Sequence, residues 1–94
     1  MSQAREPLKY ALEFFTALTM AFDKEIDTRG LNCPLPILRA KKALTELASG
    51  QVLKITATDP GSVRDFAAFA KQTGHRLLDS GEANNEFFYF LKKK

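Results

Sequence analysis

The stretch GLNCPLPILRAKKALTEL, residues 30–47, holds the only cysteine of the chain at the start of a predicted helix. Asn32 or Cys33 can occupy the N-cap, and Pro34 suits the first turn because it lacks an N–H that would be unpaired there. Gly50 follows the periodic residues and ends the helix. The side chains expected to face the core recur at helical spacing, and they are Ile37, Ala40, Leu44 and Leu47.

A strand is predicted on each side of this helix. EIDTRG, residues 25–30, places Ile26 between two acidic residues and closes on Gly30. QVLKITATDPG, residues 51–61, alternates between apolar and polar side chains, and its apolar face consists of Leu53, Ile55 and Ala57. A strand that is apolar mainly on one face indicates a sheet that is covered on one side only.

SVRDFAAFAKQTG, residues 62–74, predicts a second helix. Ser62 and Asp65 have the spacing of a capping pair, and Gly74 ends the helix. The buried stripe of this helix is expected to have Phe69 at its margin and to consist of Val63, Phe66, Ala67 and Ala70.

Two further strands complete the predicted fold. HRLLDSG (residues 75–81) and EFFYFLKK (86–93) are joined as a hairpin through EANN (82–85). The element order is therefore β-α-β-α-β-β. It predicts an α/β two-layer sandwich, in which a four-stranded mixed sheet carries two helices on one face. Right-handed crossovers make the first three strands parallel, so both helices begin at the same edge of the sheet.

The first 22 residues are an N-terminal extension of this domain, which spans residues 23–94. LKYALEFFTALTMAF, residues 8–22, is too short and too interrupted by charge to cross a bilayer, and no small-residue cleavage site follows it. Because the sandwich is complete without residues 1–20, we expect them to be dispensable for folding. The apolar residues of the extension recur at helical spacing and predict an amphipathic helix, with a stripe of Leu8, Leu12, Phe15, Leu18 and Phe22.

Composition narrows the class of protein. The 94 residues are 45% hydrophobic and 27% charged, which is typical of a single globular domain. The net charge of +3 includes a C-terminal KKK tail and does not by itself indicate nucleic-acid binding. One cysteine permits no internal disulfide, which fits a reducing compartment such as the cytoplasm. One cysteine and one histidine also exclude a familiar zinc site within the chain, so we expect no metal.

Cys33 is the candidate reactive group. His75 follows the second helix at the opposite end of the sheet, so a Cys–His catalytic pair is not expected. A helix N-terminus favours an anion and lowers the pKa of a thiol, which then reacts as the thiolate. The alternative is that Cys33 is a small buried filler. The residues expected to position the thiol are Gly30, Asn32, Pro34 and Pro36, and those expected to support its electrostatics are Arg29, Arg39, Asp59 and Arg64.

DTRGLNCPLPILRAKKAL (residues 27–44), followed by SGQVLKITATDPGSVRDFAAFAKQTGH (49–75), resembles the TusA/SirA family of small sulfur carrier proteins. The resemblance covers about residues 23–92. The mark of the family is a Cys-Pro-x-Pro motif at the start of the first helix, matched here by Cys33, Pro34, Leu35 and Pro36. A second similarity is the Asp-Pro turn before the second helix, matched by Asp59 and Pro60 and followed by Arg64 and Asp65.

This resemblance implies a function as well as the fold derived above. Family members carry sulfur as a persulfide on the motif cysteine, take it from a cysteine desulfurase or rhodanese, and pass it to a partner's thiol. They need no cofactor, and they are transfer proteins rather than stand-alone catalysts. The relays feed tRNA thiolation, molybdenum-cofactor enzyme maturation or sulfur oxidation. The carriers for tRNA thiolation have an acidic residue where this chain has Leu35, and the N-terminal extension lies outside the usual compact form.

Partner docking is expected beside the thiol. Leu35 and Leu38 fall outside the apolar stripe of the first helix, and a basic rim of Arg39, Lys41 and Lys42 surrounds them. A small apolar patch with a charged rim is typical of a transient interface, and the basic rim would attract an acidic partner. The alternative is that Leu35 packs under the N-terminal extension.

Two other functions remain open at this stage. The uncovered sheet face suggests a single-stranded nucleic-acid binding module, because aromatic side chains on an open sheet stack on bases. Alternation places Phe88 and Phe90 on one face of the last strand and Phe87 and Tyr89 on the other, so half of these rings are expected in the core. The third possibility is a redox-sensing thiol that forms a sulfenic acid at Cys33, although the chain has no second cysteine to resolve it.

Overall fold

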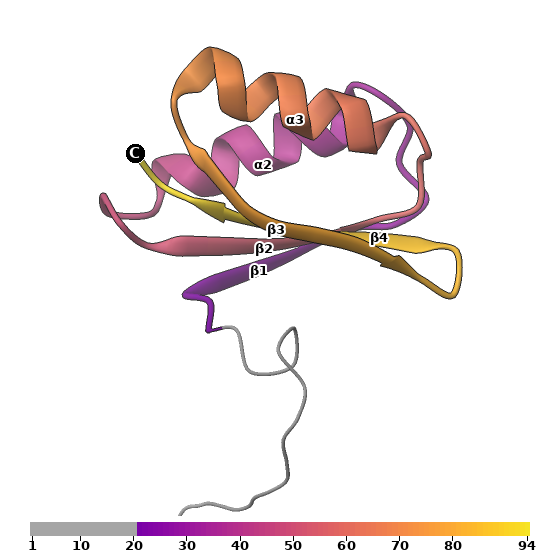
Figure 1. The fold of residues 1–94 in the computed structure, drawn as a ribbon, viewed down its shortest axis with the longest axis horizontal. Helices are drawn as coiled ribbons and strands as arrows, with labels where there is room; N and C mark the ends of the chain where they lie inside the picture. Colours follow the sequence, from indigo (N-terminus) through magenta and orange to yellow (C-terminus); the bar gives the residue numbers. More distant parts are fainter. Residues whose placement is uncertain (1–20) are drawn as a thin grey trace, which may run out of the picture.

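The structure is a computed structural model that describes residues 21–94, so all but the last two residues of the predicted helix 8–22 lie outside the described part. The elements follow the predicted order (Figure 1). They are β1 (Lys24–Thr28), α2 (Leu35–Thr45), β2 (Val52–Ala57), α3 (Ser62–Thr73), β3 (Arg76–Ala83) and β4 (Glu86–Lys92). Within residues 21–94, no helix is long and apolar enough to cross a membrane.

The sheet is mixed, with strand order β1-β2-β4-β3. β1 and β2 pair in parallel, whereas β4 is antiparallel to both of its neighbours, β2 and β3. β1, β2 and β3 therefore run in the same direction, as predicted. Figure 1 shows both helices on one face of the sheet, which confirms the two-layer α/β sandwich. Because α2 follows β1 and α3 follows β2, both helices begin at the same edge.

The core lies between the helices and the inner face of the sheet. The predicted face of β2 is buried, and β4 adds Tyr89 and Leu91. The rings of Phe66 and Tyr89 pack with their centroids 4.6 Å apart. The Tyr89 hydroxyl is paired with the hydroxyl of Ser62 at 2.6 Å, which satisfies both buried polar groups. Ser62 thus serves the core, and the prediction that it caps α3 is wrong: the N-cap of α3 is Gly61, with no side-chain hydrogen bond.

α3 presents a different face to the core from the one predicted. Phe69 is 8% exposed and belongs to the core, whereas Val63 is 50% exposed and Ala67 also faces solvent. The reason is the amount of apolar surface available. The rings of Phe66 and Phe69, one helical turn apart, bury more area than Val63 and Ala67, so the helix turns toward the two phenylalanines.

α2 also differs from the prediction in its N-cap residue and in the side chains that it buries. Its N-cap is Pro34, without a side-chain capping bond, so neither Asn32 nor Cys33 caps the helix. Of the predicted stripe, Ala40 and Leu44 are buried, while Ile37 and Leu47 only pack at the margin of the core. The remaining buried positions of the helix are Pro36 and Ala43. Leu47 lies beyond the last residue of α2, which explains why helical spacing misplaced it.

Exchanging these side chains for alanine tests the orientation of α3. Phe69→Ala should lower the free energy of unfolding by roughly 3 kcal/mol or more, since it leaves a cavity in the core. Val63→Ala, on the exposed side of the same helix, should change it by less than about 0.5 kcal/mol. Urea denaturation followed by circular dichroism measures both. A larger loss for Val63→Ala than for Phe69→Ala would contradict the observed orientation.

Candidate functional site

Cys33 lies in the loop between β1 and α2, and its side chain is exposed, which excludes a buried filler. The loop between β2 and α3 runs beside it, because β1 and β2 are parallel neighbours. The peptide bond between Cys33 and Pro34 is cis. The site therefore lies at the edge of the sheet where both helices begin, while His75 follows the other end of α3 and accepts a hydrogen bond on Nδ1 from the N–H of Lys94 at 3.0 Å.

The carboxylate of Asp59 joins the two loops. Oδ2 accepts a hydrogen bond from the backbone N–H of Cys33 at 2.9 Å, and Oδ1 accepts one from the N–H of Gly61 at 3.2 Å. Gly61 is the N-cap of α3, so Asp59 ties the residue that bears the thiol to the start of the second helix. Asp59 was expected to act through its charge, and the structure adds this positioning role.

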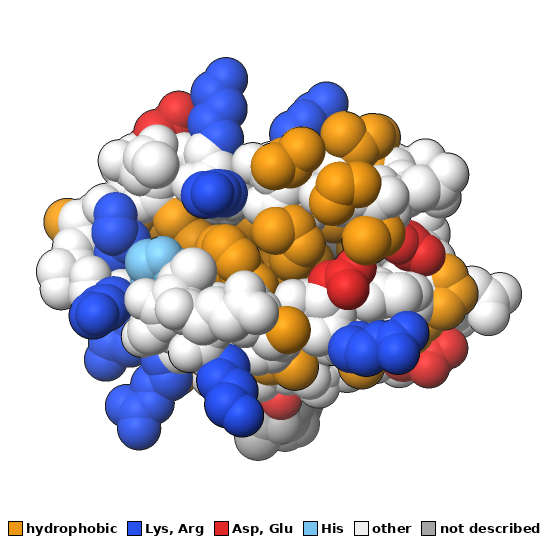
Figure 2. Space-filling view, turned by 90° about the horizontal axis from the view of Figure 1, so that it is seen from above, with side chains coloured by type: hydrophobic (Ala, Val, Ile, Leu, Met, Phe, Trp, Pro, Cys, Tyr) orange, Lys and Arg blue, Asp and Glu red, His pale blue; other side chains and the backbone are white. Residues whose placement is uncertain are grey.

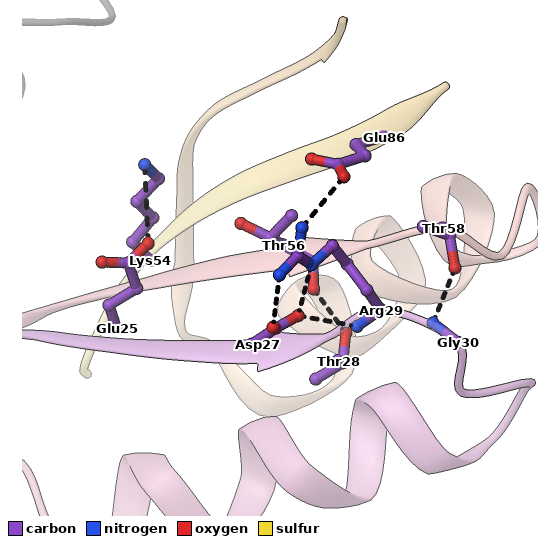
Figure 3. Close-up of polar contacts among 9 residues, drawn as sticks. All are labelled: Glu25, Asp27, Thr28, Arg29, Gly30, Lys54, Thr56, Thr58 and Glu86. Atoms are coloured by element: carbon purple, nitrogen blue, oxygen red, sulfur yellow. Dashed lines mark hydrogen bonds and ion pairs between the residues drawn. The ribbon is translucent and has the colours of Figure 1, made fainter. Parts of the chain in front are cut away.

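Three further contacts hold the thiol loop in place. The hydroxyl of Thr28 donates to the Thr56 carbonyl at 2.7 Å, and the N–H of Gly30 donates to the Thr58 hydroxyl at 2.8 Å. Figure 3 shows these bonds side by side between the ends of β1 and β2. Gly30 has a φ of +81°, which favours glycine. The Asn32 carbonyl then accepts a hydrogen bond from the N–H of Leu35 at 2.8 Å, and this bond closes a turn at the start of α2.

Arg29 does not support the thiol, contrary to the prediction. Its guanidinium donates to both carboxylate oxygens of Asp27 at 2.9 Å and to Glu86 at 3.2 Å (Figure 3). This pairing lowers the pKa of Asp27 to about 2, chiefly through the hydrogen bond from the Arg29 side chain, and raises the pKa of Arg29. Arg39 lines a separate hollow beside β1, together with Asp27 and Lys42, and Arg64 is exposed on α3.

The pKa of Cys33 is raised, so the expected lowering of the thiol pKa is wrong. The largest cause is the hydrogen bond between the thiol and the carboxylate of Asp65; loss of hydration and the negative charges of Asp65 and Asp59 act in the same direction. The reason is local geometry. Cys33 lies two residues before the first residue of α2, and the field of a helix end fades within one turn, so full charges on two nearby carboxylates outweigh it.

A hollow of about 240 Å³ opens beside the thiol between α2 and α3, and we call it the thiol hollow. Apolar side chains form most of its lining, and Asp65 and Gln72 add polar groups. Its residues are Cys33, Pro34, Ile37, Asp65, Ala68, Phe69 and Gln72. Those on α3 were missed as site residues. The predicted topology could have pointed to them, because both helices begin at one edge of the sheet and the first turn of α3 therefore lies next to Cys33.

Exposed apolar side chains lie beside the site. Leu35 is 46% and Leu38 is 52% exposed on α2, and Val63 is 50% exposed on α3. Lys42 is also exposed. Figure 2 shows apolar side chains gathered on one part of the helical face, while several lysines and arginines lie around the histidine.

A model of the family described as Sulfurtransferase TusA matches residues 24–93. The chain belongs to the TusA family. The sulfur carrier protein TusA of Allochromatium vinosum is 62% identical over 72 residues, which cover 77% of this chain and 95% of the relative. The putative sulfur carrier protein YrkI of Bacillus subtilis is 43% identical over 74 residues, covering 79% and 99%. A crystal structure of a SirA-like protein from Desulfitobacterium hafniense superposes with a TM-score of 0.67 at 28% identity, covering 74% of this chain and 96% of that one.

Membership of the TusA family makes this protein a sulfur carrier. A carrier of sulfur requires a donor that loads it and an acceptor that unloads it. The free thiol of Cys33 lies at the site described above. Among residues 21–94, no group of three or more His, Cys, Asp and Glu side chains is arranged to hold a metal ion.

Asp65→Asn tests the electrostatics of the thiol. The variant loses the carboxylate that accepts a hydrogen bond from the thiol and repels the thiolate, so the pKa of Cys33 should fall. The rate of alkylation by iodoacetamide, measured against pH, should have its midpoint at a lower pH than in the unmodified protein. Asp79→Asn, on β3, is the matched control and should leave the midpoint unchanged. An unchanged or higher midpoint in Asp65→Asn would mean that the carboxylate does not govern the thiol.

Proposed function

We propose that this sulfur carrier holds its sulfur as a persulfide on Cys33, takes it from a cysteine desulfurase or rhodanese-type donor, and passes it to a thiol of an acceptor protein. The observation that carries the proposal is the exposed thiol of the only cysteine in the chain, fixed at the meeting point of both helix starts. Its single free thiol fits the reducing cytoplasm. Routes that consume such sulfur include tRNA thiolation, molybdenum-cofactor enzyme maturation and sulfur oxidation.

Loading is a thiol–persulfide exchange. The sulfur of Cys33 attacks the outer sulfur of the donor persulfide, a new S–S bond forms, and the S–S bond to the donor cysteine breaks. The donor leaves as a thiolate, so one sulfur atom moves and no external oxidant or reductant is consumed. Unloading is the same exchange, with the acceptor thiolate attacking the outer sulfur on Cys33. Asp65 lines the same hollow as Cys33 and is the candidate group to take the proton of the thiol.

The raised pKa of Cys33 suits a carrier that moves between partners. A protonated thiol is a poor nucleophile and oxidises slowly, so the unloaded protein is protected while it diffuses. A thiol of high pKa is also a poor leaving group, which slows the loss of the carried sulfur to thiols other than that of the acceptor. Partner binding then has to favour the thiolate, and a cation beside Asp59 and Asp65 would do so by offsetting their charges.

The apolar patch of Leu35, Leu38 and Val63 is the proposed docking surface. An interface made in turn with a donor and an acceptor has to be small, and three exposed apolar side chains at a functional edge fit that requirement. Lys42 at the border supports attraction of an acidic surface. Nucleic-acid binding on the sheet face opposite the helices is not proposed, because Phe90, one of the four aromatic residues of β4 considered for stacking, is only 2% exposed.

Incubation with a cysteine desulfurase and cysteine tests the chemistry. Intact mass should rise by about 32 Da, the mass of one sulfur atom, and a reductant should reverse the gain. Cys33→Ser should show no gain. If several competent donors leave the unmodified protein at its starting mass, Cys33 does not carry the sulfur.

Leu38→Glu tests the docking surface. Because Leu38 is exposed, the free energy of unfolding should change by less than about 0.5 kcal/mol, while the rate of sulfur transfer from a desulfurase should fall several-fold. Leu78→Glu provides the matched control, since Leu78 is a 39% exposed leucine on β3. Transfer at the normal rate in Leu38→Glu would locate docking elsewhere.

A further inference from the structure

The thiol hollow extends from Cys33 along one face of α3. Its four residues on this helix recur at helical spacing, and they are Asp65, Ala68, Phe69 and Gln72. Cys33 lies at the start of α3, because Asp59 joins its N–H to that of Gly61, the N-cap of the helix. Gln72 lies about 10 Å further along the helix than Asp65. The hollow is therefore elongated, with the thiol at one end.

The hollow has room for one large apolar side chain. Ala68 is exposed and places only a methyl group between α2 and α3, while Ile37 and Phe69 supply apolar walls. The volume of about 240 Å³ exceeds the cavity of about 150 Å³ that binds benzene in another protein. Binding sites are commonly concave and apolar with a few polar groups, and here Asp65 and Gln72 supply the polar groups.

The end of the hollow next to the thiol is acidic. Asp65 lines it, and the Asp59 carboxylate lies 2.9 Å from the N–H of Cys33. Within residues 21–94, neither carboxylate takes part in an ion pair. In Figure 2, acidic side chains border the apolar side chains gathered on the helical face. Because the sulfur of Cys33 has to react as a thiolate, a cation brought by the partner would favour the reaction at this end.

The length of the hollow sets the spacing of the partner's side chains. A partner cysteine has to reach Cys33 at the acidic end, whereas Ala68 and Phe69 lie about 4.5 and 6 Å beyond Asp65 along α3. In an extended chain, residues two positions apart point to the same side and lie about 6.6 Å apart. The side chain that enters the hollow therefore comes from a residue two positions from the partner's cysteine. Asp59 precedes α3, so a basic side chain that faces it lies on the other side of that cysteine.

We propose that the thiol hollow binds the cysteine-bearing segment of the sulfur-transfer partner in extended form. An apolar side chain two residues to one side of the partner's cysteine fills the hollow, and a basic side chain two residues to the other side faces Asp59 and Asp65. This inference rests on the proposed function and adds the chemistry of the segment that exchanges sulfur. The partner thus needs an acidic surface opposite Lys42 and a basic residue near its cysteine, and these opposite requirements give specificity.

The first experiment measures disulfide exchange with short peptides and needs no sulfur donor. The peptides Lys-Gly-Cys-Gly-Leu and Leu-Gly-Cys-Gly-Lys cover both chain directions, and each carries thionitrobenzoate on its cysteine as a mixed disulfide. Cys33 loses its proton to the buffer and attacks the peptide sulfur, a new S–S bond forms, and thionitrobenzoate leaves as a coloured thiolate. Each rate is divided by the rate of N-acetylcysteine with the same peptide, which removes differences in intrinsic reactivity.

At least one of the two peptides should react about tenfold faster than its matched peptide with glycine in place of leucine. It should also react about threefold faster than the peptide with glutamate in place of lysine. The net charge of +3 on the chain would favour the glutamate peptide, so this second ratio reports the local carboxylates. Equal rates with leucine and glycine in both chain directions would overturn the proposal, and so would a faster reaction of the glutamate peptides.

The second experiment fills the hollow from α3. Ala68→Trp blocks it, and Ala67→Trp is the matched control, since both alanines are exposed but only Ala68 lines the hollow. Ala68→Trp should remove the advantage of the leucine peptide and slow sulfur transfer from a desulfurase several-fold, whereas Ala67→Trp should preserve both. An unchanged leucine advantage in Ala68→Trp would refute the assignment of the hollow.

Sodium polysulfide separates this inference from the proposed function. It transfers one sulfur atom to Cys33, becomes one sulfur atom shorter, and is too small to need the hollow. The unmodified protein and both tryptophan variants should therefore gain about 32 Da to the same extent. If the unmodified protein gains no sulfur from polysulfide or from a desulfurase, the proposed function is wrong, and the peptide rates still decide whether the hollow recognises a cysteine-bearing segment.

Discussion

The Asp59 carboxylate, held between the N–H groups of Cys33 and Gly61, is the contact on which the geometry of the site depends. Two parallel strands end at the same edge of a sheet, but this alone leaves the loops that follow them free to separate. Asp59 is already fixed as the residue that opens the turn into α3, since its carbonyl also accepts the N–H of Ser62 at 2.9 Å. The thiol loop therefore takes its position from the second helix, and α2 and α3 present one shared edge.

The same carboxylate that orders the loop also sets the electrostatic character of the thiol. An acidic residue is well suited to accept two backbone N–H groups, because a carboxylate forms stronger hydrogen bonds than a neutral acceptor. Its charge, together with that of Asp65, disfavours the thiolate. Positioning and reactivity are thus opposed in the unloaded protein. This opposition is tolerable in a carrier, whose sulfur has to move only when a partner is present.

The order of elements and the location of the cysteine could be predicted from the sequence, because both depend on local periodicity and on turn residues. The orientation of α3 could not, since it results from the competition between Phe69 and Val63 for burial against β3 and β4. Nor could the contact of Asp59 with Cys33, which joins residues 26 positions apart. The position of Arg29 was within reach of sequence reasoning. Asp27 is two residues before it, and side chains two apart on an extended chain lie on the same side.

The direction of the Cys33 pKa shift shows why the remainder of the site could not be predicted from the sequence. Sequence reasoning expected Asp59 and the three arginines Arg29, Arg39 and Arg64 to support the electrostatics of the thiol, together with the start of α2. In space, Arg29 is neutralised by Asp27 and Glu86. The charged groups that reach the thiol are Asp59, in the loop after β2, and Asp65, in the first turn of α3. Parallel β-α units bring the starts of successive helices together, so in this fold the partners of a residue at one helix start are found at the next helix start, and the local sequence on either side of the cysteine is a poor guide to its chemistry.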